Sequence, residues 1–69
     1  PIGADSGIFE VLLAGGETLV VVTDVRNTSA SILLKADSDK LRSQLLQKRL
    51  ELESGLKRRM NRQVRLAVL

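Results

Sequence analysis

The sequence predicts an α+β fold: a small mixed sheet of about four strands in the order β-β-β-α-β, with one amphipathic helix packed on one face. Three observations predict it. Two aliphatic runs flank the pair Gly15-Gly16, a leucine pattern at helical spacing follows residue 38, and a short alternating segment closes the chain. With 69 residues, the chain is long enough for one domain with a single small core.

The first two runs, residues 7–14 and 17–25, are predicted to form a β-hairpin. Glycine adopts positive φ without a steric clash, so Gly15-Gly16 suits the tight turn between them. The second run is apolar on both faces at residues 19–22. That pattern indicates a central strand or a second apolar surface that faces a partner.

A third strand is predicted at residues 30–36, after a turn-prone break; the start of a helix is the competing interpretation. The run Asp37-Ser38-Asp39 has strong N-cap chemistry, so Asp37 or Ser38 is expected to cap a helix. This helix is expected to run to about residue 54 and to stop at Gly55, in the C′ position.

The rest of the chain is read as a basic connection at residues 57–62 and a final strand at residues 63–68. A helix between the third and fourth strands permits the last strand to pair in parallel with an earlier one. Residues 1–6 are expected to be an irregular lead-in, and residues 7–69 to form the single globular domain.

The predicted core follows from alternation on the strands and helical spacing on the helix. It comprises Phe9, Val11, Leu13, Val21, Ile32, Leu34, Leu41, Leu45, Leu52, Val64, Leu66 and Val68.

Composition excludes several kinds of chemistry. The chain has no Cys and no His, which excludes disulfides, thiolate nucleophiles, imidazole catalysis and Cys or His metal sites. Gly15-Gly16 precedes a strand rather than a helix N-terminus, so it is no phosphate-cradling loop. We therefore predict no enzyme, no cofactor and no metal. No apolar run approaches the roughly 20 residues of a membrane-spanning helix, so no membrane insertion is expected.

Charge is divided unevenly along the chain. Residues 1–36 carry four acids and two bases, whereas residues 37–69 carry four acids and nine bases. Three interpretations compete: a solvated surface that complements the helix dipole, a docking patch for an acidic protein, and a nucleic-acid site. Phe9 is the one aromatic residue, which disfavours nucleic-acid binding through base stacking.

Two segments resemble a known family. Gly7-Ile8-Phe9-Glu10-Val11-Leu12-Leu13 resembles the Leu-Gly-x-Val-Glu-Val-x-Leu strand of flagellar hook-length control proteins, and a Gly-rich turn and a Val-rich strand follow it, as in that family. Leu41-Arg42-Ser43-Gln44-Leu45 resembles their Leu-Arg-x-x-Leu helix. The layout is also similar to the C-terminal substrate-specificity-switch domain of needle-length regulators in virulence-type type III secretion. The basic tail, and the lack of the flagellar Pro-x-x-Leu-Gly lead-in, favour the needle type.

The resemblance implies a non-enzymatic molecular ruler in the bacterial cytoplasm at the secretion apparatus, able to leave the cell through it. The implied partner is the cytoplasmic domain of the export-gate switch protein. Because Pro1 is not an initiation residue, we expect the chain to be the C-terminal domain of such a ruler, without its long N-terminal region. The predicted partner-binding residues are Arg58, Arg59, Arg62 and Arg65, with Val20 and Val22.

Two other functions stay open from the sequence. One is a small basic module that binds RNA or ribosomes, which the charge of the C-terminal half would serve. The other is a plain dimerisation domain that uses the outer face of the second strand.

Overall fold

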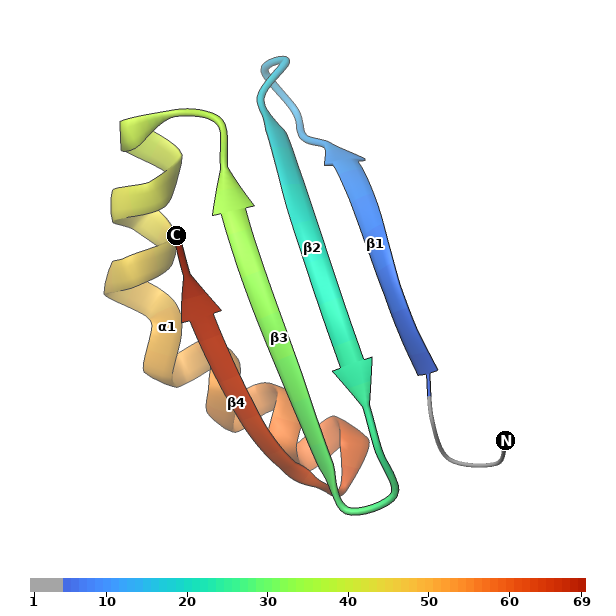
Figure 1. Ribbon diagram of the computed structural model, residues 1–69. Helices are drawn as coiled ribbons and strands as arrows, with labels where there is room; N and C mark the ends of the chain where they lie inside the picture. The colour runs from blue at the N-terminus through green and yellow to red at the C-terminus, as the bar shows by residue number, and fades with distance from the viewer. Residues whose placement is uncertain (1–4) are drawn as a thin grey trace.

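The structure is a computed structural model that describes residues 5–69. Its elements are β1 (Asp5–Leu12), β2 (Thr18–Val25), β3 (Ser29–Ala36), α1 (Asp39–Met60) and β4 (Gln63–Val68). The four strands form one sheet in the order β1-β2-β3-β4, and α1 lies beside β4 and β3 (Figure 1). This confirms the predicted α+β fold and its element order. Of the predicted lead-in, residues 1–4 lie outside the described residues and residues 5 and 6 belong to β1.

Glycine makes the predicted turn between β1 and β2. Gly15 and Gly16 have φ of 92° and 86°, a region that side chains with a Cβ rarely adopt. The Gly16 N–H donates to the Leu13 carbonyl at 3.1 Å, and the Leu13 N–H donates to the Glu17 carbonyl at 2.8 Å. The turn therefore sets the antiparallel register of β1 against β2, in which Phe9 lies opposite Val21.

The last strand pairs in parallel with β3, as the crossover helix allows. Ala30 lies beside Val64, and Ile32 lies beside Leu66. The remaining pair, β2 with β3, is antiparallel. Residues 30–36 are therefore a strand and not the start of the helix.

The helix begins at the predicted cap. The Ser38 side chain accepts a hydrogen bond from the Leu41 N–H at 3.1 Å, and Ser38 has an extended backbone. Its hydroxyl also donates to Glu17. Asp37 has a different task, because its Oδ2 accepts from both the N–H and the hydroxyl of Thr18 at 2.9 Å. The cap thus also ties the start of α1 to the start of β2.

The predicted end of the helix is wrong. The helix α1 continues through Gly55 to Met60 and ends at Asn61, which has φ of 54° and donates its N–H to the Lys57 carbonyl at 2.9 Å. A helical Gly costs about 1 kcal/mol relative to Ala. Leu56 and Met60 continue the half-buried stripe of the helix, so their packing outweighs that cost. Most of the predicted basic connection is therefore the last turn of α1.

The core is smaller than predicted. The buried side chains are Ala30, Leu34, Leu41, Val64 and Leu66, between 2% and 9% exposed. Ala30 was not among the predicted core residues. Leu13, Val21, Ile32, Leu45 and Val68 are half-buried.

Three predicted core residues are exposed: Phe9 at 54%, and Val11 and Leu52 at 38% each. Within residues 5–69, α1 packs mainly against β4, less against β3, and does not reach β1 or β2. One helix is about 10 Å wide and strands are about 4.8 Å apart, so α1 can cover two strands of four. The ring of Phe9 lies back over Gly7 instead, within 2.7 Å of where a Cβ would stand.

No helix within the described residues is both long enough and apolar enough to cross a membrane.

Candidate protein-interaction surfaces

The predicted partner-binding residues lie on two sides of the molecule. Arg58 and Arg59 are exposed on α1. Arg65 points to the opposite side of the sheet, because it alternates with the buried Val64 and Leu66. Val20 and Val22 point to that side as well, because their partners on β3 alternate with the buried Leu34. The six residues therefore do not form one surface.

Arg62 is engaged within the chain. Its Nε donates to the carbonyls of Arg26 at 2.8 Å and Asn27 at 3.3 Å, and its Nη1 donates to the Met60 carbonyl at 3.5 Å. These contacts join the turn between β2 and β3 to the end of α1. Reversing the charge of Arg62 would therefore disturb this junction as well as any docking patch.

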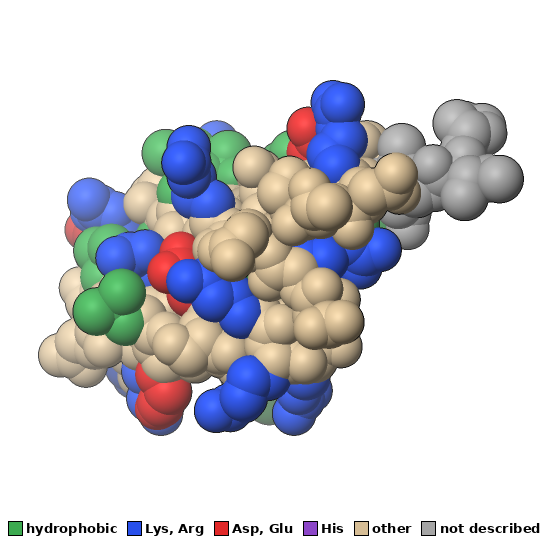
Figure 2. All heavy atoms as spheres, turned by 90° about the horizontal axis from the view of Figure 1, so that it is seen from below, with side chains coloured by type: hydrophobic (Ala, Val, Ile, Leu, Met, Phe, Trp, Pro, Cys, Tyr) green, Lys and Arg blue, Asp and Glu red, His purple; other side chains and the backbone are tan. Residues whose placement is uncertain are grey.

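The basic end of the molecule is visible in Figure 2, which looks along the sheet from the end where α1 stops. Lys and Arg side chains are spread over this view, with fewer acidic side chains among them (Figure 2). The last turn of α1 supplies Lys57, Arg58 and Arg59. Cations there complement the negative end of the helix dipole, so part of this charge serves the helix itself.

A shallow hollow runs along α1, and we call it the helix groove. Its first part, of about 510 Å³, is lined by Leu41, Gln44, Leu45, Gln47, Lys48 and Leu52. Its second part, of about 240 Å³, is lined by Glu51, Leu52, Gly55, Leu56, Arg58 and Arg59. The two parts share the partly exposed Leu52.

The helix groove combines an apolar floor with a mainly basic rim. Leucines form the floor, whereas Lys48, Arg58 and Arg59 outnumber the single acid Glu51 at the rim. Protein interfaces commonly place apolar side chains at the centre and polar groups at the rim. This arrangement suits an apolar segment that carries acidic residues, since complementary charge steers and orients the partner.

The sheet face away from α1, here called the outer face, has no layer over it in the described structure (Figure 1). Its residues are Ser6, Ile8, Glu10 and Leu12 on β1, Thr18, Val20, Val22 and Asp24 on β2, Ser29, Ser31, Leu33 and Lys35 on β3, and Gln63, Arg65 and Ala67 on β4.

An apolar row crosses this outer face from edge to edge. Ile8 lies opposite Val22, Val22 opposite Leu33, and Leu33 beside Ala67. Ile8 is 75% exposed, and Leu12, further along β1, is 73% exposed. Because the row is continuous, these are not scattered surface residues; together they form an apolar patch of the kind that marks interaction sites.

A polar row lies beside the apolar one. Asp24 accepts from the Ser6 hydroxyl at 3.0 Å and forms an ion pair with Arg26 at 3.1 Å. The hydrogen bond from Arg26, and after it the one from Ser6, lower the pKa of Asp24 below its usual value.

Asp37, which lies between β3 and α1, also has a lowered pKa, because it accepts hydrogen bonds from the backbone N–H and the hydroxyl of Thr18. Neither carboxyl is poised to take up a proton at neutral pH.

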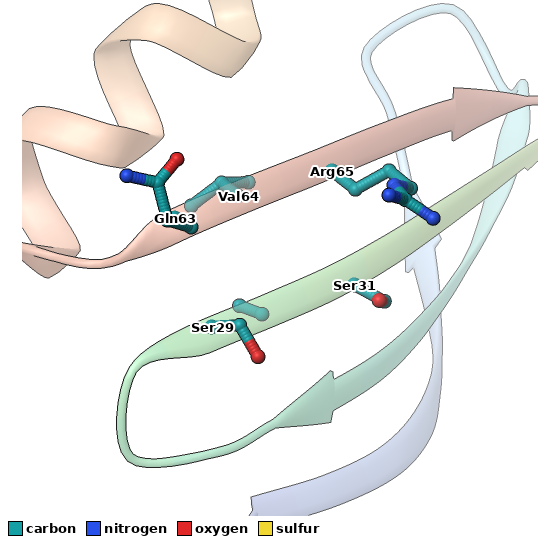
Figure 3. A pocket seen from close by; sticks show the side chains of 6 residues that line it. Ser29, Ser31, Gln63, Val64 and Arg65 are labelled. Atoms are coloured by element: carbon teal, nitrogen blue, oxygen red, sulfur yellow. The ribbon is translucent and has the colours of Figure 1, made fainter.

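A hollow of about 330 Å³ lies at the start of β3 and β4. Figure 3 shows that Ser29 and Ser31 extend from β3, and Gln63 and Arg65 from β4. One guanidinium, two hydroxyls and an amide supply hydrogen-bond donors, but these residues include no carboxylate or imidazole to act as a base. Within residues 5–69, no three potential metal ligands among Asp, Glu, His and Cys come together.

One polar cluster was not anticipated from the sequence. Glu53 Oε2 accepts the Leu66 N–H at 2.9 Å, while Arg49 Nη1 donates to the Leu66 carbonyl at 3.2 Å and to Glu53 at 3.4 Å. Two side chains of α1 thereby form hydrogen bonds with the backbone N–H and carbonyl of Leu66 in the edge strand β4. The available signal was the spacing of Arg49 and Glu53, which puts them on one face of a helix.

Comparison with known protein families, with curated proteins and with solved structures finds no match to this chain.

Proposed function

We propose that this chain is a non-enzymatic docking domain of a type III secretion needle-length regulator. In this role it docks on the cytoplasmic domain of the export-gate switch protein and changes export from early needle subunits to later substrates. The observation that carries the docking function is the helix groove, with its leucine floor and its rim of Lys48, Arg58 and Arg59. The secretion role rests on the resemblance of residues 7–13 and 41–45 to length-control proteins.

The groove supports docking better than catalysis or small-molecule binding. It is shallow and elongated along one helix, whereas small-molecule sites enclose most of their ligand. Its basic groups are exposed, so each contributes little to folding and is available to a partner. A partner whose acidic side chains reach Arg58 and Arg59 can cover Leu52 and Leu56 at the same time.

The test is the double charge reversal Arg58→Glu with Arg59→Glu in the complete regulator. The control is Lys40→Glu with Arg42→Glu, which changes the net charge equally at exposed positions of α1 outside the groove. We expect the first variant to bind the purified switch-protein domain at least about tenfold more weakly, with a difference that shrinks as salt rises. In cells it should be exported, fail to switch substrates and give overlong needles.

The control variant should bind and switch normally. Its new acids lie near the helix N-terminus, where negative charge is favourable. Normal binding and normal needle length in a folded Arg58→Glu, Arg59→Glu variant would show that the helix groove is not the docking site. Equal loss in both variants would show that only net charge matters.

The spread of Lys and Arg in Figure 2 favours a second candidate, an RNA-binding or ribosome-binding module. Such binding depends on phosphate neutralisation, so affinity for mixed RNA should fall steeply between about 50 and 200 mM salt. Filter binding at these two concentrations measures this. Tight, salt-sensitive RNA binding that both double variants weaken equally would favour this function over docking in the groove.

A further inference from the structure

We propose that the outer face binds a second copy of this chain, sheet against sheet, about a two-fold axis that runs along β2. This goes beyond the proposed function, because it uses the side of the molecule opposite the helix groove. The proposal rests on the order in which charged and apolar residues follow one another across β1, β2 and β3.

Two rows of the outer face carry the argument. In one row, Glu10 of β1 and Lys35 of β3 flank Val20. In the next row, Ile8 and Leu33 flank Val22. Each row is therefore centred on a valine of β2, with its outer members on the two neighbouring strands.

A two-fold axis along β2 exchanges β1 and β3 and leaves each row at its own height. Glu10 then faces Lys35 of the second copy, and Lys35 faces Glu10 of the second copy. Ile8 and Leu33 face each other in the same way, while Val20 and Val22 each face their own counterparts. The face is thus complementary to itself both in charge and in apolar character, which is the condition for a closed dimer.

Glu10 and Lys35 have no competing ionic partner among the residues that the structure describes. Within residues 5–69, neither Glu10 nor Lys35 forms an ion pair, and both are exposed. Packed sheets lie about 10 Å apart, a gap that a Glu and a Lys side chain can span together at the rim. Asp24 would face its own counterpart, but its carboxylate is already held by Arg26 and Ser6.

The contact area sets the expected strength. Three strands of eight residues make a face of roughly 400 Å² per copy, before the corrugation of side chains adds to it. The total approaches the lower limit of about 1,000 Å² for specific interfaces. The dimer is therefore weak and reversible, and its population rises with protein concentration.

The experiment is sedimentation equilibrium over a wide concentration range, with single charge reversals. Wild-type protein should dimerise. Glu10→Lys places Lys against Lys35, and Lys35→Glu places Glu against Glu10, so each variant alone should dimerise at least about tenfold more weakly. Mixed in equal amounts, the two variants should form a heterodimer, because both facing pairs become opposite in charge.

Lys40→Glu, a charge reversal on α1 outside the helix groove, is the matched control for Lys35→Glu and should dimerise like wild type. Thermal unfolding of each variant separates loss of association from loss of folding. Wild-type protein that stays monomeric, or two folded variants that do not associate when mixed, would overturn the proposal. The Arg58→Glu, Arg59→Glu variant should still dimerise, so failure of this inference and failure of the proposed function are distinguishable.

Discussion

The two halves of the sheet differ in cover rather than in composition. Beneath α1, Val64 and Leu66 of β4 are 6% and 3% exposed, whereas on the same face of the sheet Phe9 and Val11 of β1 are 54% and 38% exposed. Both halves are rich in aliphatic residues. The difference teaches that the position of α1, and not the composition of the strands, decides which apolar side chains form the core. The covered half holds the core, and β1 in the bare half leaves large apolar side chains exposed.

The largest expected effect tests this division directly. Leu66→Ala should destabilise the domain by about 2–5 kcal/mol, because it leaves a cavity among buried side chains. Phe9→Ala should cost less than about 1 kcal/mol, although it removes more atoms, because the ring is half in solvent. Urea unfolding of the two variants gives both values. Similar losses would show that β1 is covered after all.

The two edges of the sheet offer the next comparison. The β4 edge is occupied at Leu66 by Glu53 and Arg49, whereas no other strand lies beyond β1 (Figure 1). Glu53→Ala should leave the Leu66 N–H without its acceptor and cost about 1–3 kcal/mol. Amide exchange at Leu66 should accelerate with it.

Glu51→Ala is the control for that substitution, since Glu51 is exposed on the same helix. It should change stability by no more than about 0.5 kcal/mol. An unchanged exchange rate at Leu66 in the Glu53→Ala variant would mean that the edge is protected by other groups. The comparison between a blocked and an open edge would then lose its basis.

Local chemistry explains what could be predicted from the sequence. The element order, the Gly15-Gly16 turn and the Ser38 cap all follow from residues close together in the chain, and the structure confirms each. The helix before the last strand permitted a parallel pairing, and the structure has one between β3 and β4. Strand alternation also assigned Phe9 and Val11 to the same face of the sheet as the core.

The sequence could not predict in the same way which strands of the sheet α1 would cover. Whether Phe9 is buried depends on where α1 comes to lie across four strands, and alternation within β1 is the same with or without a helix above it. The six predicted partner-binding residues lie on two sides of the molecule for a similar reason: their grouping came from their positions along the chain and not from the arrangement of the elements in space. Charge along the chain grouped Arg65 with Arg58, but one belongs to the outer face and the other to α1.

The smallest expected effect concerns Gly55 in α1, the helix that covers one half of the sheet. As the C′ stop that the sequence suggested, Gly55 would need positive φ, and Ala there would destabilise the domain. In the structure it is a helical residue, and a Cβ built on it meets nothing within 4 Å. Gly55→Ala should therefore stabilise the domain by about 0.4–1 kcal/mol, because it reduces the conformational freedom of the unfolded chain. Thermal unfolding measures the sign. A lower melting temperature would indicate that α1 ends at residue 54. Leu56 and Met60 would then not belong to the helix, and α1 would cover a smaller part of the sheet.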